Sequence, residues 1–287
     1  MSKIKIAELF YSIQGEGRYM GVPSVFLRTF GCNFKCAGFG MPRGELSHEA
    51  TDIAATHKMI ESFQKYEELP LVSTGCDSYA SWHPDFKELS PMLTSDAIAD
   101  RISEIIPFGE WKEEHLVITG GEPLLGWQRA YPDLLSHPKM KGLKEITFET
   151  NGTQKLDPKF KEYLGQWQNE GRTLDKEITF SVSAKLPCSG EKWEDAICPE
   201  VVCEYEDIGT AYLKFVIATE QDFEDAMKAT AEFRDAGFTG HVYLMPVGGV
   251  ESVYALNNKA VAIMAMKAGL RYSDRLQVPL FKNEWGT

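Results

Sequence analysis

Short runs of apolar and β-branched residues recur along the chain and alternate with stretches in which apolar residues stand three and four positions apart. The runs predict strands at residues 3–10, 25–30, 115–119, 145–150, 177–182, 212–217 and 241–245. The other stretches predict helices at residues 95–106, 127–135, 157–168, 221–235 and 252–268. Strands that alternate with helices form parallel crossovers, so we expect an α/β fold with a parallel sheet. The six strands from residue 25 onward are too few for a closed eight-stranded barrel and predict a partial, incomplete parallel β/α barrel.

Residues 37–94 do not follow this alternation. They contain one possible helix, at residues 48–66, between two stretches without periodicity. Connections this long are uncommon inside a compact domain and usually have a function. We predict a single domain over residues 1–287, with residues 37–94 as an insertion.

The charge balance and the apolar pattern restrict the partners and the location. The 287 residues include 42 acidic and 30 basic side chains, a formal charge of −12, which would repel a nucleic acid. No apolar run approaches the roughly 20 residues that span a bilayer, so no membrane association is expected. The first residues, MSKIKIAELFYSIQGEG, lack the apolar stretch of a signal peptide. The prediction is a cytoplasmic protein whose six cysteines stay thiols.

Two of these cysteines, Cys32 and Cys36, directly follow the strand at residues 25–30. Ligands of α/β folds bind at the carboxyl ends of strands. Two thiolates separated by three residues can face one metal centre, and thiolates select zinc, copper(I) or iron–sulfur clusters. The pair alone is equally consistent with two unrelated buried thiols.

Polar and glycine residues follow the next two strands. VITGGEP at residues 117–123 ends in two glycines, which let a ligand approach the backbone, and in Glu122, whose carboxylate can accept hydrogen bonds from an ammonium group. ETNGT at residues 149–153 places polar groups at the end of the following strand. Each string taken alone also fits an ordinary turn.

Taken together, the cysteine loop and the Gly-Gly-Glu-Pro turn resemble those of radical S-adenosylmethionine enzymes. YSIQGEG at residues 11–17, FLRTFGCN at 26–33 and ETNGT at 149–153 resemble, more specifically, the 7-carboxy-7-deazaguanine synthase family of the queuosine and 7-deazapurine pathway. The resemblance implies a lyase that converts 6-carboxy-5,6,7,8-tetrahydropterin to 7-carboxy-7-deazaguanine with loss of ammonia.

The chain departs from the family pattern at the third cysteine. The family carries C-x3-C-x2-C, and here Phe39 occupies the third position, whereas Cys76 precedes Asp-Ser where the family has Asp-Thr. We infer that the insertion interrupts the motif, giving C-x3-C-x39-C, because a long excursion can return its ends close together at modest entropic cost. The alternative is that the cluster has been lost and Cys76 is incidental.

The resemblance implies a [4Fe-4S] cluster on Cys32, Cys36 and Cys76, with one iron left open for S-adenosylmethionine, and it implies no further catalytic residue. It implies that Ser78 binds Mg2+, with Asp77 in support. It implies that S-adenosylmethionine contacts Thr119, Gly120, Gly121, Glu122, Glu149, Asn151, Ser183 and Lys185. It implies that the pterin contacts Gln14, Glu16, Arg28 and Gln277. The planar guanidinium of Arg28 suits bidentate binding of the pterin carboxylate.

As partners, the resemblance implies a reductant protein such as flavodoxin and a homodimer. Two other interpretations stay open. One is a radical enzyme with another substrate, for example a glycyl-radical activase. The other is a non-catalytic regulatory or binding relative, favoured by Phe39 and by Met245 where the family has glutamine. Cys188, Cys198 and Cys203 have no familiar ligand spacing and are interpreted as ordinary thiols.

Overall fold

Nine strands form one sheet in the computed structural model, which describes residues 2–170 and 175–287. Their order is β3-β1-β2-β4-β5-β6-β7-β8-β9. The pairs from β2 to β9 are parallel, and β1 pairs antiparallel with both β2 and β3. The strands are β1 (Lys3–Ile13), β2 (Pro23–Thr29), β3 (Met92–Thr94), β4 (His115–Gly120), β5 (Glu145–Thr150), β6 (Glu177–Val182), β7 (Thr210–Ile217), β8 (Val242–Pro246) and β9 (Arg271–Tyr272).

The α/β fold with a largely parallel, open sheet is thus confirmed. β5 and β6 have the predicted bounds. β3 and β9 were not predicted, because strands of three and two residues are too short to show an alternation.

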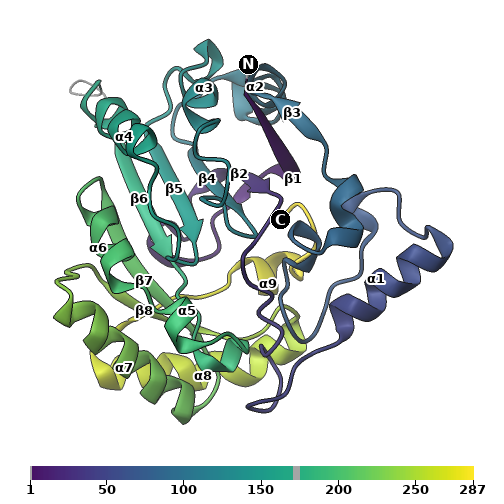
Figure 1. Ribbon diagram of the computed structural model, residues 1–287, viewed down its shortest axis with the longest axis vertical. Helices are drawn as coiled ribbons and strands as arrows, with labels where there is room; N and C mark the ends of the chain where they lie inside the picture. Colours follow the sequence, from purple (N-terminus) through teal and green to yellow (C-terminus); the bar gives the residue numbers. More distant parts are fainter. Residues whose placement is uncertain (1, 171–174) are drawn as a thin grey trace.

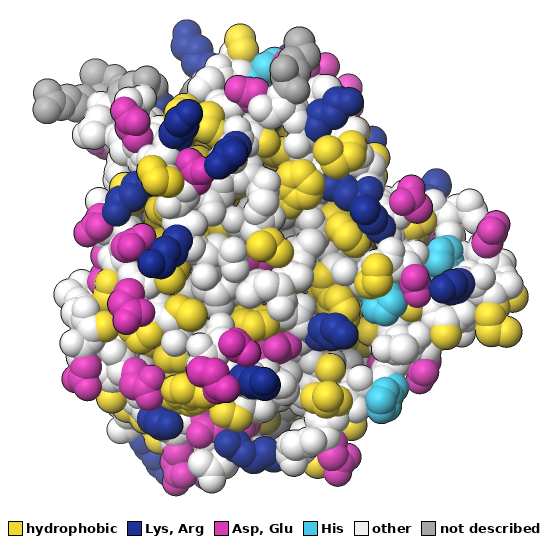
Figure 2. Space-filling model, in the orientation of Figure 1, with side chains coloured by type: hydrophobic (Ala, Val, Ile, Leu, Met, Phe, Trp, Pro, Cys, Tyr) yellow, Lys and Arg dark blue, Asp and Glu magenta, His cyan; other side chains and the backbone are white. Residues whose placement is uncertain are grey.

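The strands of the sheet pack against α2, α4, α6, α7 and α8. Figure 1 shows α3, α4, α6, α7 and α8 along the row of strands and α1 apart from them. The helices are α1 (Glu49–Ile60), α2 (Ser95–Ile105), α3 (Tyr131–Leu135), α4 (Pro158–Glu170), α5 (Trp193–Ala196), α6 (Pro199–Glu206), α7 (Glu220–Asp235), α8 (Glu251–Ala268) and α9 (Gln277–Phe281). Figure 2 shows Asp and Glu side chains gathered over α6 and α7, in keeping with the acidic composition. Among the described helices, none is both long and apolar enough to cross a bilayer.

Two helix predictions need correction. The helix expected at residues 48–66 ends at Ile60, because Glu61 adopts a left-handed conformation with φ of 44°. The helix expected at residues 127–135 begins only at Tyr131, and Pro132 stands in its first turn, where its missing N–H costs no hydrogen bond. The short helices α5, α6 and α9 were not predicted.

The alternation of side chains along the strands separates an apolar core from a polar face. On β7, Leu213, Phe215 and Ile217 are buried in the main core, whereas Lys214 and Val216 line a cavity on the opposite face of the sheet. The core covers the helix side of the sheet and includes stacked aromatic rings. The other face is therefore the one available to a ligand.

The segment from residue 37 to residue 94 builds its own small apolar cluster against β1. Tyr66, Tyr79 and Phe86 are its largest buried members. The Gly75 N–H donates to the Phe39 carbonyl over 2.7 Å, so the chain leaves and returns at adjacent points. This closure brings Cys76 back beside the cysteine loop.

Candidate active site

A cavity lies over the polar face of the sheet, at the carboxyl ends of the parallel strands. Its walls come from strands β1, β2, β4, β5, β7 and β8 and from the loops that follow them, with residues from the insertion and the C-terminal segment. Fifteen of the sixteen site residues expected from the sequence line it: Gln14, Glu16, Arg28, Cys32, Cys36, Cys76, Ser78, Thr119, Gly120, Gly121, Glu149, Asn151, Ser183, Lys185 and Gln277.

The three cysteines of the interrupted motif meet at one end of this cavity. Cys32, Cys36 and Cys76 pack in one small cluster that also contains Phe39. Burial raises the pKa of the Cys32 thiol to about 12 and raises the pKa values of Cys36 and Cys76 as well. Lys185 opposes this effect at all three sulfurs, because its positive charge favours the thiolates. The site therefore has one cation that faces three potential thiolate ligands.

The three thiols are not placed to bind a single metal ion together. Within residues 2–170 and 175–287, no three His, Cys, Asp or Glu side chains are placed to share one metal ion. A four-iron cluster binds each thiolate through a different iron, so its ligands stand farther apart than those of a single ion. Three thiols that line one end of the cavity can bind three irons of such a cluster and leave the fourth iron open to a ligand in the cavity.

The glycine turn after β4 leaves room beside these thiols. A Cβ at Gly121 would lie 2.5 Å from the Gly31 carbonyl oxygen and 2.6 Å from Cys32 Cβ. Gly120 has φ of 148°, which an L side chain rarely adopts, and its Cβ would lie 2.3 Å from the Thr29 carbonyl oxygen. Both glycines are thus required for the end of β4 to contact the cysteine loop.

Glu122, the sixteenth expected residue, does not line the cavity. Its carboxylate accepts hydrogen bonds from the Leu124 N–H (3.0 Å), the Thr150 hydroxyl (2.8 Å) and the Asn151 N–H (2.6 Å). Burial raises the pKa of Glu122 to about 7, and these donors oppose the rise. In this structure Glu122 joins the ends of β4 and β5, and so positions Asn151, whose side chain does line the cavity.

A buried lysine that the sequence analysis missed connects two of the expected ligand residues. The Lys214 ammonium lies 2.6 Å from Glu16 Oε2 and 2.9 Å from Glu149 Oε2, and its side chain is 2% exposed. Burial alone would raise the pKa of Glu16, but Lys214 and Arg275 lower it to about 2. The two carboxylates in turn raise the pKa of Lys214, against the effect of its burial. Glu16 and Lys214 are therefore both charged at neutral pH.

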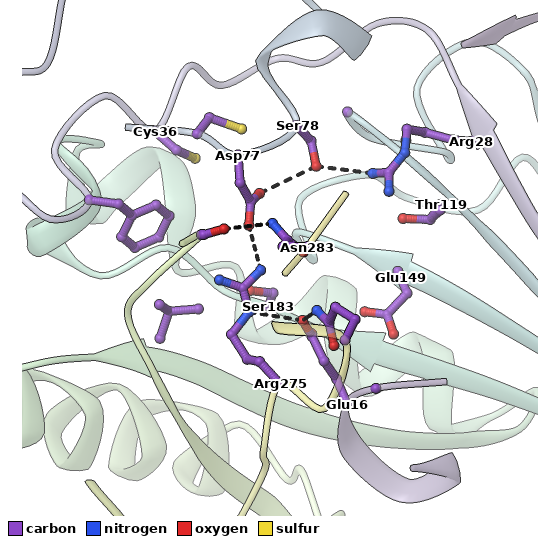
Figure 3. Close-up of a pocket in the computed structure, with 18 of the residues that line it drawn as sticks. Glu16, Arg28, Cys36, Asp77, Ser78, Thr119, Glu149, Ser183, Arg275 and Asn283 are labelled. Carbon is purple, nitrogen blue, oxygen red and sulfur yellow. Dashed lines mark hydrogen bonds and ion pairs between the residues drawn. The ribbon is translucent and has the colours of Figure 1, made fainter. Parts of the chain in front are cut away.

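The charged network continues across the cavity (Figure 3). Arg275 donates to Glu16 Oε1 over 3.2 Å and also pairs with Asp77, whose pKa it lowers against the effect of burial. Ser78 is 3.4 Å from the Asp77 carboxylate and accepts a hydrogen bond from Arg28 Nη1 over 3.0 Å. Charges of both signs thus alternate along one wall, which suits a flat ligand with several donors and acceptors.

Lys214 and Arg275 are the functional residues that sequence reasoning missed. The signal for Lys214 was present, because a lysine inside the apolar run TAYLKFVI is rarely buried without partners. Arg275 lies two residues from Gln277, which was expected in the site. Nothing local identifies its partners, because Asp77 lies 198 positions away.

These features define a class of protein: an α/β enzyme whose three cysteines can hold an iron–sulfur cluster beside a polar small-molecule cavity. No protein-family model matches the chain. It is similar to the 7-carboxy-7-deazaguanine synthase of Halobacterium salinarum, with 29% identity over 98% of this chain and 91% of that protein. It is likewise similar to the 7-carboxy-7-deazaguanine synthase of Pyrobaculum aerophilum, with 24% identity over 99% of this chain and 97% of that protein.

Among solved structures, QueE from Escherichia coli has a similar fold. The TM-score is 0.55 with 19% identity, over 96% of this chain and 94% of that one. The resemblance to the 7-carboxy-7-deazaguanine synthases that three short strings indicated is thus confirmed over nearly the whole chain.

Proposed function

We propose that this protein is a radical S-adenosylmethionine lyase that converts 6-carboxy-5,6,7,8-tetrahydropterin to 7-carboxy-7-deazaguanine with loss of ammonia. The near full-length similarity to synthases of that name supports this function. The observation that carries it is the convergence of the expected cluster, cofactor and substrate residues on one cavity.

For the cofactors, we propose that Cys32, Cys36 and Cys76 hold a [4Fe-4S] cluster. When bound, such a cluster supplies the electron that cleaves S-adenosylmethionine and generates the radical. The hydrogen bond from the Gly75 N–H to the Phe39 carbonyl supports this ligand set, because it brings the chain back beside the cysteine loop directly before Cys76. The residues that we propose to bind S-adenosylmethionine directly are Thr119, Gly120, Gly121, Glu149, Asn151, Ser183 and Lys185, with Glu122 holding the turn behind them.

For the pterin, we propose Gln14, Glu16, Arg28 and Gln277. The low pKa of Glu16 keeps it a carboxylate, which can accept hydrogen bonds from an aminopyrimidine ring. Gln277 donates to Glu16 over 2.9 Å, and its buried Oε1 has no partner among the described residues. An unpaired buried acceptor is costly, so a ligand N–H that paired with it would be favoured.

We propose that Ser78 contributes an oxygen ligand to Mg2+, with Asp77 beside it. Mg2+ prefers oxygen ligands and keeps several waters, so one hydroxyl together with substrate oxygens can complete its coordination. The positive charge of neighbouring Arg28 is balanced by Glu8, 2.7 Å from Arg28 Nε. Because Glu8 balances this charge, Arg28 repels a cation bound at Ser78 less than an unpaired arginine would.

We further propose one domain over residues 1–287 with an insertion at 37–94, a reductant protein such as flavodoxin as electron donor, and a homodimer. The dimer is supported by the exposed side chains of Leu256, Ile263 and Met266, which recur at helical spacing on α8. Reduced thiols at the cluster site favour the cytoplasm as the place of action.

The test is a complete anaerobic assay. The protein is reconstituted with iron and sulfide, then given 6-carboxytetrahydropterin, S-adenosylmethionine, Mg2+ and a reductant, and the products are identified by mass spectrometry. We expect 7-carboxy-7-deazaguanine only when S-adenosylmethionine is present. Cofactor cleavage that does not depend on the pterin, without this product, would favour another substrate. A folded protein that binds no iron would favour a non-catalytic relative.

A further inference from the structure

Glu191 holds the cysteine loop from outside the cavity. Its Oε1 accepts hydrogen bonds from the backbone N–H of Lys35 (2.9 Å) and of Cys36 (2.7 Å). Glu191 directly follows the short turn Pro187–Ser189 and Gly190, and its own N–H donates to Ser189 Oγ over 3.2 Å. A single carboxylate oxygen thus binds the two N–H groups at the second cysteine.

A second contact joins the same two segments. The Gly38 N–H donates to the Ser189 carbonyl over 2.8 Å, and a Cβ at Gly38 would lie 2.6 Å from the Gly190 nitrogen. Between these contacts, Cys36 has φ of 50°, which is unfavourable for a residue with a side chain. A strained residue persists only where its surroundings hold it, and here the hydrogen bonds to Glu191 and Ser189 do so.

The contact has an electrostatic consequence for a cluster on this loop. Hydrogen bonds from backbone N–H groups to the sulfurs, and positive charges nearby, favour the reduced state of an iron–sulfur cluster, which carries one more negative charge. Glu191 occupies two of the loop's N–H groups and adds a negative charge beside Cys36.

We propose that Glu191 is a positioning residue that lowers the reduction potential of the cluster held by the cysteine loop. The proposal rests on the proposed function, because it requires the cluster. It adds that residues 187–191, which supply no ligand to the cluster, make the bound cluster a stronger electron donor. Lys185 lines the cavity together with the three cysteines, and its positive charge acts in the opposite direction.

The test compares Glu191→Gln with Glu194→Gln in the reconstituted protein. The glutamine at 191 keeps an oxygen that can accept both N–H bonds but removes the charge. Glu194 lines the same shallow hollow as Glu191 and has no hydrogen bond to the loop among the described residues, so it controls for a general loss of charge. The midpoint potential of each protein is measured by an anaerobic redox titration followed by electron paramagnetic resonance.

For Glu191→Gln we expect the ratio of reduced to oxidised cluster at a fixed potential to rise about tenfold. This is the size expected for one charge roughly 12 Å away at an effective dielectric constant of about 20. It corresponds to a shift of about 59 mV toward positive potential for one electron. Glu194→Gln should shift the potential less. In the cluster-free protein, Glu191→Ala should speed hydrogen exchange at the Lys35 and Cys36 amides.

The outcomes separate this proposal from the function on which it rests. A wild-type protein that binds no cluster would contradict the proposed function. A wild-type protein that binds a cluster, with the same potential in Glu191→Gln, would overturn the role of Glu191 alone. Equal shifts in Glu191→Gln and Glu194→Gln would also overturn it. So would a folded Glu191→Gln protein that fails to load a cluster, because Glu191 would then serve assembly.

Discussion

Replacing Lys214 with methionine tests whether the buried network is essential to the fold of the site. The substitution keeps a side chain of similar length but leaves two buried carboxylates, Glu16 and Glu149, without their shared cation. Breaking a buried pair in this way typically costs about 3–5 kcal/mol. Because Glu16 keeps Arg275 and Glu149 keeps the Ser181 hydroxyl at 3.0 Å, we expect the lower end, about 3 kcal/mol.

The cost should depend on pH in a defined direction. The folded-state pKa of Glu16, about 2, lies below its ordinary value of 4.5, so the folded protein favours the carboxylate. That stabilisation is complete above pH 4.5 and is lost as the pH falls toward 2. Lys214→Met removes part of it. The difference in free energy of unfolding between wild type and variant should therefore be largest at neutral pH and shrink below pH 4.5.

Thermal and urea unfolding of both proteins, followed by circular dichroism at pH 7 and at about pH 3.5, measure this difference. At pH 7 a loss of about 3 kcal/mol lowers Tm by roughly 6–12 °C for a protein of this size. Lys161→Met is the control, because its partner Asp207 is 65% exposed and such pairs contribute less than about 1 kcal/mol. A Lys214→Met variant as stable as Lys161→Met, or one whose deficit does not shrink in acid, would refute the reasoning.

Three further substitutions test the rest of the site. Cys76→Ser should abolish the iron and sulfide content after anaerobic reconstitution, whereas Cys198→Ser should keep it; full loading of Cys76→Ser would contradict the interrupted motif. Gly121→Ala should lower both cluster loading and Tm, because its Cβ would overlap the cysteine loop, whereas Gly165→Ala on α4, with no atom within 4 Å, should be neutral or stabilising by up to about 1 kcal/mol. Ser78→Ala should raise the Mg2+ concentration needed for half-maximal turnover with cluster content unchanged; an unaltered Mg2+ dependence would refute its proposed role.

The parallel core of the fold could be predicted because its signal is local. β5 and β6 are short apolar runs with polar residues at their ends, so their bounds follow from the pattern. The length of α1 could not be predicted in the same way. Nothing in the local sequence indicates that Glu61 adopts a left-handed conformation, although residues beyond it continue the helical pattern.

The same distinction between local and distant signals applies to the residues of the candidate site. Gly121 and Cys32 stand in short strings with a recognisable order, and the structure brings both to the cavity. Lys214 and Arg275 do not, because each acts through partners far away in the sequence, such as Glu16 at a separation of 198 residues from Lys214. Pairings of that kind arise from the fold: the apolar run around Lys214 indicates that this lysine has partners, but nothing local identifies them.

The hydrogen bond between Phe39 and Gly75 has a consequence for how this chain can vary among its relatives. Everything between these two residues leaves the scaffold and rejoins it at neighbouring points, so the ends of the excursion stay together whatever its length. The part of the excursion before Val72 can therefore be lengthened or exchanged without moving Cys76, whereas Val72 and Ser73 line the cavity and belong to the site. Diversity at this position can accumulate without altering the spatial arrangement of the three sulfurs.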